Sequence, residues 1–262
     1  SVLESLKNII TNRPLLAVIL ANFFNSFKSV GGSSESYFWL NNTGSLLNQT
    51  ICGLFTGIPN YIMVPIAAKM VKKWGARATS IIAGLFGFFA YMTLFFVGFH
   101  PFGQTFKDHY IFNLIWVIFG LTICGLPNKI LNVSGQIVTA EALDYMEWKH
   151  GLRNEALVTT VQGYFGKLAT SVTGWLSGMV LTWINYVPLT DSLGNAVPQT
   201  DPTMLNGIWA VFCILPALAR GLYGVSFIIY PIHGDLQQQM IIELAEKRAQ
   251  RLAEQEAKDH QA

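Results

Sequence analysis

The chain has 262 residues and a mass of 29.1 kDa, and 52% of its residues are hydrophobic while only 12% are charged. Soluble domains carry about 25% charged residues, so this composition excludes an ordinary water-soluble domain. A formal net charge of +2 is too small to build a basic face for nucleic-acid phosphates. We therefore expect a polytopic membrane protein whose surroundings are the lipid bilayer, with no nucleic-acid partner.

Six stretches are long and apolar enough to cross a bilayer, which takes about 20 residues of helix. They are Pro14–Leu40, Ile51–Val71, Thr79–Phe99, Tyr110–Leu143, Leu157–Ile184 and Met204–Tyr230. These stretches predict an all-α fold in which six transmembrane helices form one bundle over residues 14–230. Residues 1–13 are a lead-in and residues 231–262 a tail. The first helix is expected to break at Gly31-Gly32.

The positive charges of the short loops predict the orientation, because Lys and Arg gather on the cytoplasmic side. One side carries twelve of them: Lys7, Arg13, Lys69, Lys72, Lys73, Arg77, Lys149, Arg153, Lys247, Arg248, Arg251 and Lys258. The other side carries Lys107 alone. We therefore expect a cell-membrane protein with both termini in the cytoplasm. In the tail, apolar residues recur at helical spacing (Leu236, Met240 and Leu244), which favours a solvated or membrane-surface helix over a regulatory or oligomerising one.

Charges inside the predicted spans are the first functional signal, because a cation inside a membrane normally faces the bundle interior or a water-filled cavity. Lys167 lies near the middle of the fifth span, which points to a substrate or coupling site, with a structural ion pair as the alternative. Three further cations lie nearer a helix end or break, where snorkelling or packing explains them at least equally well: Lys28, Lys129 and Arg220.

Two polar stretches predict a hydrophilic path through the bundle. The first span carries Asn22, Asn25 and Lys28 three residues apart on one face. The fourth span holds two residues that disfavour helix, Gly125 and Pro127. It also holds five polar or charged residues: Asn128, Lys129, Asn132, Ser134 and Gln136. We expect that helix to be discontinuous around a cavity. A glycine stripe on the fifth span, Gly163 to Gly178, is attributed to close helix packing.

Enzyme and metal signatures do not stand out in the sequence. The five histidines fall in loops or the tail without a catalytic motif, and no phosphate-binding Gly-rich loop is present. Cys52, Cys124 and Cys213 lack the spacing of a zinc site or a disulfide framework. We expect neither an enzyme nor a bound cofactor or metal.

The segment after the fourth span carries a specific family resemblance. It reads D-Y-M-E-W-K-H-G-L-R from Asp144 to Arg153 and is followed by a span with Gln162 and Lys167. This run resembles the glycoside–pentoside–hexuronide:cation symporters, the melibiose-permease-like branch of the major facilitator superfamily. The basic stretch from Lys69 to Arg77 looks like the cytoplasmic loop of that superfamily.

The resemblance implies half of a twelve-helix transporter, in which this chain supplies helices seven to twelve and an N-terminal six-helix half is the partner. It implies a cytoplasmic gate at Glu141, Asp144 and Arg153, and Glu147 continues the same acidic edge of a helix. It also implies a substrate and coupling cavity at Lys167 and Gln162, to which the polar faces add Asn132 and Asn25. The site for the coupling cation, Na⁺ or H⁺, would belong to the other half.

These observations predict secondary active transport of a sugar or glycoside, coupled to a cation, by alternating access. Three positions depart from the family pattern: Met146 replaces a Gly, Gly163 a possible Thr, and Asn132 the Trp of melibiose permease. The last two leave the sugar open. A carrier of an amphiphilic lipid and a membrane sensor or scaffold without transport activity are the alternatives.

Overall fold

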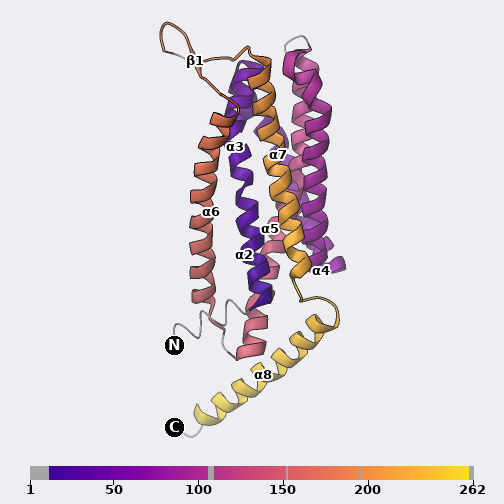
Figure 1. The fold of residues 1–262 in the computed structure, drawn as a ribbon. Coiled ribbons are helices and arrows are strands. Elements are labelled where there is room, and N and C mark those ends of the chain that lie inside the picture. The colour runs from indigo at the N-terminus through magenta and orange to yellow at the C-terminus, as the bar shows by residue number, and fades with distance from the viewer. Residues whose placement is uncertain (1–11, 106–108, 152, 195, 260–262) are drawn as a thin grey trace.

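The computed structural model describes residues 12–105, 109–151, 153–194 and 196–259. The chain forms an elongated bundle of helices with a further helix crossing its lower end (Figure 1). In order the elements are α2 (Arg13–Ser26), α3 (Lys28–Phe38), the π-helix η1 (Trp39–Thr43), α4 (Leu47–Thr105), α5 (Tyr110–His150), α6 (Glu155–Trp183), the strands β1 (Leu189–Thr190) and β2 (Ala196–Val197), α7 (Pro202–Ser226), the 3₁₀ helix η2 (Phe227–Ile229) and α8 (Asp235–Asp259). The predicted lead-in at residues 1–11 and Lys107 lie outside the described residues.

Within the described part, four helical segments are long and apolar enough to span a membrane. They are Arg13–Thr43, Leu47–Val97, Tyr110–His150 and Pro202–Ile229. The second contains two of the predicted spans, so these four segments account for five of the six. The remaining predicted span, Leu157–Ile184, corresponds to α6. This helix has 29 residues, or about 43 Å, but its Gly, Ser, Thr and Lys residues make it less apolar than the other four segments. The prediction of an all-α, polytopic bundle is confirmed, with a two-residue antiparallel hairpin as the exception.

The helix α4 is a hairpin rather than one rod. A straight helix of its 59 residues would be about 88 Å long, yet Cys52 and Leu94 share one buried cluster. The chain reverses at Gly75, whose φ of 80° and ψ of 162° are open to glycine and strained for other residues. Arg77 stabilises the turn by donating hydrogen bonds to the carbonyl oxygens of Phe227 (3.1 Å) and Ile228 (2.9 Å) in η2, directly after α7.

The first span breaks at Phe27, so the expected break at Gly31-Gly32 is wrong. The Ser29 hydroxyl donates to the carbonyl oxygen of Ser26 at 2.7 Å, and side-chain bonds of this kind compete with the helical ladder. The two glycines lie inside α3. Gly31 is needed for another reason, because a Cβ there would lie 2.6 Å from Cδ of Pro216 on α7. Glycine thus allows α3 and α7 to pack closely.

The prediction of a discontinuous fourth helix is also wrong, because α5 runs without a break from Tyr110 to His150. Pro127 lies inside it and is buried. Proline removes one backbone donor, and neighbouring helices can compensate such a loss inside a membrane bundle. The helix ends at Gly151, which has a φ of 71° and donates to the carbonyl oxygen of Glu147 at 2.8 Å. Glycine is common just past the end of a helix because it adopts a positive φ without strain.

Two buried clusters hold the bundle together. One contains Phe38, Trp39 and Phe212 and lies toward the β1 end, and its rings of Phe38 and Phe212 stack with centroids 5.1 Å apart. The other includes Val138 and Tyr223 and lies toward the end that carries α8 (Figure 1). The bundle is therefore well packed near both ends, and the polar residues described below lie between them.

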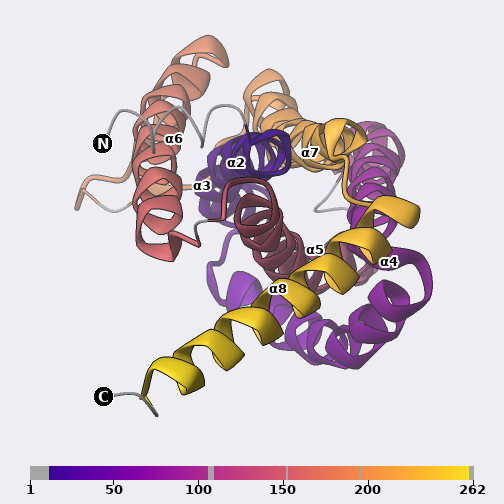
Figure 2. The same ribbon diagram turned by 90° about the horizontal axis from the view of Figure 1, so that it is seen from below.

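The tail helix α8 is packed against the bundle and is not merely solvated. Seen from below, it crosses the end of α5 (Figure 2). Met240 and Leu244 are 1% and 3% exposed and belong to the buried cluster near that end, against which Trp148 also packs. The Trp148 indole N–H donates to Glu243 at 2.6 Å. The solvated-helix interpretation is therefore wrong for this face of α8.

Candidate functional site

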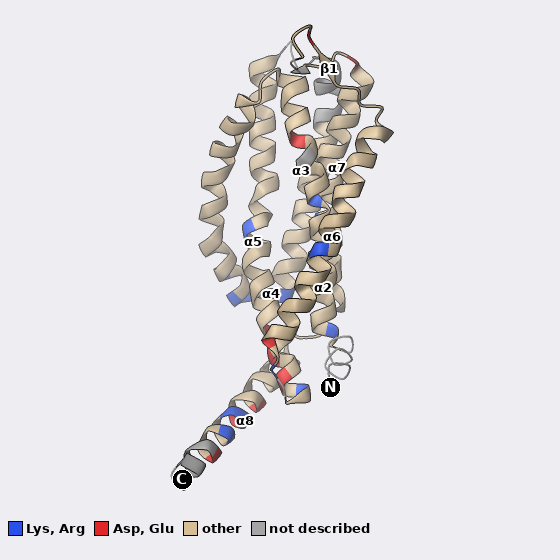
Figure 3. Ribbon diagram, turned by 90° about the vertical axis from the view of Figure 1, so that its left-hand side faces the viewer, with Lys and Arg blue, Asp and Glu red and all other residues tan. Residues whose placement is uncertain are grey.

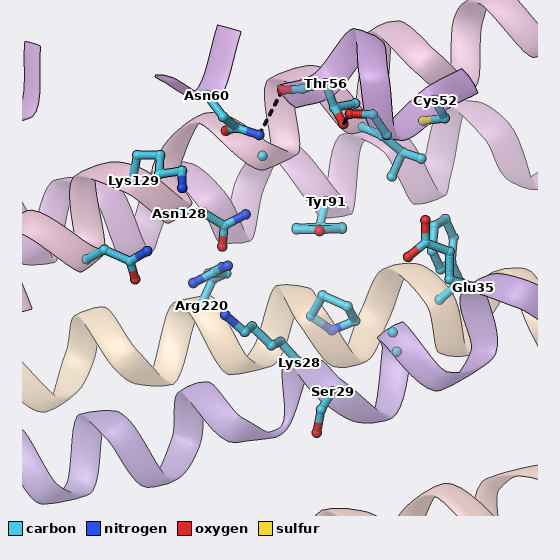
Figure 4. A pocket seen from close by; sticks show the side chains of 18 residues that line it. Lys28, Ser29, Glu35, Cys52, Thr56, Asn60, Tyr91, Asn128, Lys129 and Arg220 are labelled. Carbon is cyan, nitrogen blue, oxygen red and sulfur yellow. Dashed lines mark hydrogen bonds between the residues drawn. The ribbon is translucent and has the colours of Figure 1, made fainter. Parts of the chain in front are cut away.

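A polar hollow of about 500 Å³ lies among α3, α4, α5 and α7. It falls in the size range of small-molecule sites in proteins. Polar side chains from the first arm of α4 and from α5 line it, including Thr56, Asn60 and Asn128 (Figure 4). Asn60 donates from Nδ2 to the carbonyl oxygen of Thr56 at 2.8 Å, which leaves its buried Oδ1 without a hydrogen-bond partner. That oxygen can accept a hydrogen bond from a ligand.

The hollow gathers charges from three helices: Lys28 of α3, Lys129 of α5 and Arg220 of α7. Arg220 is only 2% exposed, and its Nη1 donates to Oδ1 of Asn25 at 2.9 Å. Its side chain packs against Gly87 of α4. A Cβ at that position would lie only 3.1 Å from Cγ of Arg220, so glycine leaves the space that the side chain occupies. Glu35 is the acid of the hollow, on the same helix as Lys28.

A second hollow of about 440 Å³ adjoins the first, and Asn132 lines both. It is bordered by Asn22 and Asn25 of α2 and by Gln136 of α5. The two polar stretches in which the sequence predicts a hydrophilic path are thus brought together. Asn132 and Asn25, two of the predicted cavity residues, lie at these hollows.

The structure does not bring the other two predicted cavity residues, Lys167 and Gln162, to either hollow. Lys167 is exposed on α6, and Gln162 is half-buried with its Nε2 buried and unpartnered. α6 packs on α2 and α3 at one side of the bundle (Figure 1). Side chains built on Gly163 and Gly166 would meet nothing within 4 Å, and the same holds for Gly174 and Gly178. The glycine stripe is therefore not explained by packing within the described part of this chain.

Three of the four predicted gate residues, Asp144, Glu147 and Arg153, form an ionic network at the end that carries α8. The Lys, Arg, Asp and Glu residues concentrate at this end (Figure 3). Arg153 folds back after Gly151 and binds Asp144 at 2.8 Å, with Glu155 at 2.7 Å. Arg248 of α8 also binds Asp144 at 2.8 Å. Asp144 is thus shared by two arginines, one from the α5–α6 connection and one from the tail.

Glu147 is the centre of this network. It is 6% exposed and lies 2.5 Å from Arg248, 3.3 Å from Arg251 and 3.8 Å from Arg153. The hydrogen bond from Arg248 is the main cause that lowers the pKa of Glu147 below its ordinary value. The carboxylate therefore stays ionised and holds α8 against α5.

Glu141, the fourth predicted gate residue, lies outside this arginine network. Its carboxylate accepts hydrogen bonds from the Tyr230 hydroxyl at 2.8 Å and from Gln237 Nε2 at 2.7 Å. Tyr230 lies in the segment that leads into α8, and Gln237 lies in the first turn of α8. Glu141 therefore joins α5 to the tail through neutral groups.

Arg248 and Arg251 were not predicted from the sequence as members of this network, and Lys28 and Arg220 were predicted only as cations placed by snorkelling or packing. A signal for the first pair was available, since Met240, Leu244 and Arg248 recur every four residues and share a helix face. For the second pair, position along a span says nothing about which way a side chain faces. Only the packing of α7 on α2 and α4 shows that Arg220 points inward.

Comparison with known proteins places the chain among transporters. The family model described as MFS/sugar transport protein matches residues 1–234. The chain is 29% identical over 245 residues to the uncharacterized symporter YjmB of Bacillus subtilis (strain 168), covering 92% of this chain and 48% of that protein. It is 22% identical to the isoprimeverose transporter of Lactiplantibacillus pentosus (94% and 47%) and 22% identical to the glucuronide carrier protein homolog of Escherichia coli (strain K12; 93% and 50%). The chain spans about half the length of these curated relatives.

Proposed function

The chain belongs to the family of MFS/sugar transport proteins, and from this premise we propose that it forms the C-terminal half of a secondary transporter for a sugar. The observation that carries the proposal is the polar hollow among α3, α4, α5 and α7. Polar side chains inside a membrane bundle are costly and mark substrate paths. Asn60, Asn128 and Thr56 offer amide and hydroxyl groups that suit sugar hydroxyls. Relatives named as transporters agree with the expectation that the protein is not an enzyme.

Three observations support a partner half. The matched relatives are about twice as long as the chain. A Cβ added to any glycine of the α6 stripe, from Gly163 to Gly178, would have no atom within 4 Å. The same holds for Gly53 and Gly57 of α4, so these glycines lie on open faces of the chain. Open faces of small residues let a second helix approach closely in a membrane. Lys167 and Gln162 lie on the same open helix, so the partner half would complete their surroundings.

In this proposal the two halves rock about a sugar bound near the membrane midplane, and the movement exposes the site to each side in turn. The network of Asp144, Glu147 and Arg153 acts on the cytoplasmic side, because the basic loops of the sequence concentrate at the same end. Both termini then lie in the cytoplasm. Coupling to Na⁺ or H⁺ follows the resemblance to cation symporters, with the cation site in the partner half.

Uptake by the complete transporter tests the proposal. The protein would be reconstituted in liposomes, and accumulation of radiolabelled sugars would be measured with and without an inward gradient of Na⁺ or H⁺. We expect gradient-driven accumulation of a sugar, and its loss in Asn128→Leu, which fills the hollow with an apolar side chain. Gln238→Ala, on the exposed surface of α8, is the matched control and should transport normally.

The alternatives predict other results in the same assay. Movement of a lysolipid and of no sugar would support the amphiphile carrier. No movement of either by a well-folded complete protein would support a sensor or scaffold. If sugar uptake occurred but was not increased by a gradient of Na⁺ or H⁺, the proposal of sugar transport would hold and the proposal of cation coupling would be rejected.

A further inference from the structure

The Asn25 side chain stands between the two hollows. It belongs to the last turn of α2 and lines the second hollow, whereas its partner Arg220 comes from α7 and lines the first (Figure 4). Nη1 of Arg220 donates to Oδ1 of Asn25 at 2.9 Å. This hydrogen bond therefore joins the walls of the two hollows, and Asn132 of α5 lines both of them.

The chemistry of arginine fixes the orientation of the Asn25 amide. A guanidinium carries N–H donors and no acceptor, so the atom of Asn25 that meets Arg220 must be the amide oxygen. The opposite orientation would set two donors against each other. Beside a hydroxyl or a second amide an asparagine can turn over, because such groups both donate and accept. Beside Arg220 it cannot, and Nδ2 of Asn25 is held on the side away from the arginine.

Arg220 is itself held in place by packing. It is 2% exposed, and a Cβ at Gly87 of α4 would lie 3.1–3.4 Å from its Cγ, Cβ and Cδ. The stem of the side chain therefore lies against α4 with little room to move. The guanidinium is a fixed donor, and the amide that it binds shares this fixed position.

An amide is not the partner that stability alone would favour for this arginine. Buried charges are ordinarily paired with an opposite charge, yet no carboxylate pairs with Arg220 among the residues that the structure describes. An aspartate in place of Asn25 would neutralise the guanidinium but would offer acceptors only. Asparagine binds the arginine through its oxygen and keeps the N–H groups of Nδ2 for another partner. These N–H groups are not needed for the contact with Arg220.

No acceptor for Nδ2 of Asn25 is present in the described part of the chain, although Asn22 and Gln136 border the same hollow. Polar groups of this kind inside a membrane bundle mark substrate paths, and a sugar has hydroxyl and ring oxygens that accept hydrogen bonds. We propose that Arg220 is a positioning residue, which directs Nδ2 of Asn25 toward an oxygen of the transported sugar in the second hollow. This inference rests on the proposed function, because it names how that sugar is held.

A double-mutant cycle on the purified complete transporter tests whether Arg220 acts through Asn25. Calorimetry with D-xylose, D-glucose, D-galactose and D-glucuronate identifies the sugar that the wild-type protein binds most tightly. If it binds none of these, the probe is the sugar that it accumulates in the uptake assay. We expect Asn25→Ala and Arg220→Met each to weaken binding about tenfold, and the double variant to weaken it about tenfold as well. A combined loss of about 100-fold would show independent roles and overturn the inference.

Two substitutions of Arg220 separate the orientation of the amide from other effects. Arg220→Lys keeps a cation that only donates, so its binding of the probe sugar should stay within about threefold of the wild type. Arg220→Gln can also accept from Nδ2 of Asn25, which lets the amide turn over, and should weaken binding. Binding by the Gln variant that equals or exceeds that of the Lys variant would overturn the inference. Gln238→Ala, on the exposed surface of α8, is the control and should bind as the wild type does.

Asn25→Asp keeps the test informative if the Arg220 variants do not fold. Its carboxylate should pair with the buried guanidinium and raise the melting temperature, while the loss of the N–H groups should weaken the probe sugar by about five- to tenfold. A purely structural role of Asn25 predicts equal or tighter binding in this more stable protein. That result would overturn the inference.

The inference and the proposed function can fail separately. If the wild-type protein moves a sugar and the cycle is additive, the positioning role of Arg220 fails and sugar transport stands. If the complete protein folds but neither binds nor moves any sugar, the proposed function fails, and the inference fails with it.

Discussion

Arg248 of α8 and Asp144 of α5 lie 2.8 Å apart although 104 residues separate them in the sequence. The pair belongs to a network whose buried member is Glu147, and it fixes the tail helix to the end of α5. The tail is therefore joined to the helix that carries Asn128, Lys129 and Asn132 of the hollow. A change in the position of α5 would therefore move α8 or break its ion pairs with α5.

Removing this link should release α8. In Arg248→Gln, Glu147 keeps Arg251 and Arg153, so we expect a loss of about 1–2 kcal/mol in the docking of α8. Hydrogen exchange of the α8 amides in the complete transporter should rise about tenfold. Glu246→Gln, on the exposed side of α8, should leave exchange unchanged, and equal exchange in both variants would show that the apolar contacts alone hold the helix.

The same docking should depend on pH. Because the pKa of Glu147 is lowered when α8 is docked, its contribution is fully present above the ordinary glutamate pKa of about 4.3. It is lost as the pH falls through the lowered value. Exchange of α8 should therefore increase below about pH 4, and Glu147→Gln should remove that increase. An identical acid response in Glu147→Gln would assign the effect to other carboxylates.

Two adjacent glycines give opposite predictions. A methyl group at Gly31 would overlap the Pro216 ring, whereas one at Gly32 would meet nothing within 4 Å. Gly31→Ala should cost about 1–3 kcal/mol through forced repacking of α3 against α7 and should lower the melting temperature of the complete protein by several degrees. Gly32→Ala should be neutral or slightly stabilising because alanine favours helix. Similar melting temperatures in the two variants would contradict the close packing of α3 and α7.

Asp144 should influence the balance between the two states of the transporter. It is bound by Arg153 and by Arg248, so Asp144→Asn removes two ion pairs and Arg153→Gln removes one of them. We expect both variants to favour the inward-open state, with the larger effect in Asp144→Asn, and to lower accumulation more than binding. Labelling of single cysteines on the cytoplasmic side measures the shift. Unchanged labelling in both would leave the network with only a structural role.

Lys167 tests the role predicted for α6. Lys167→Ala should abolish coupled uptake while the protein still inserts, because the side chain would lie against the partner half at the cavity. It is exposed in this chain, so the substitution should not lower the stability of the bundle. Lys167→Arg keeps the charge and should retain part of the uptake. Normal accumulation by Lys167→Ala would exclude the residue from coupling.

Hydropathy and charge were enough to predict the helical bundle, because apolar runs of about 20 residues have few stable alternatives in a membrane. The helix end at Gly151 was also predictable from the sequence, since glycine there adopts a positive φ. The break at Phe27 was not, because neither proline nor glycine stands at that position in the sequence. Pro127 led to the prediction of a break that the structure does not have, since α5 continues through this buried proline.

The site was predictable only in part, for a geometric reason. The asparagines at three-residue spacing share a helix face, so Asn25 could be assigned to a polar path from the sequence alone. The inward direction of Arg220 depends on where α7 crosses α2 and α4, and that crossing depends on contacts such as Gly84 against Gly224, where a built Cβ would lie 2.7 Å from the opposing Cα. Contacts between distant segments leave no local signal.

Protection of a cysteine in the hollow by substrate tests the central claim most directly. In a complete transporter with Cys52, Cys124 and Cys213 replaced by alanine, Asn128→Cys would be labelled with a water-soluble thiol reagent, with Gln238→Cys on α8 as the control. We expect the sugar identified by the uptake assay, at saturating concentration, to slow labelling of Asn128→Cys at least tenfold and to leave Gln238→Cys unaffected. Undiminished labelling of Asn128→Cys in a protein that still transports that sugar would contradict the claim that this hollow is the substrate site.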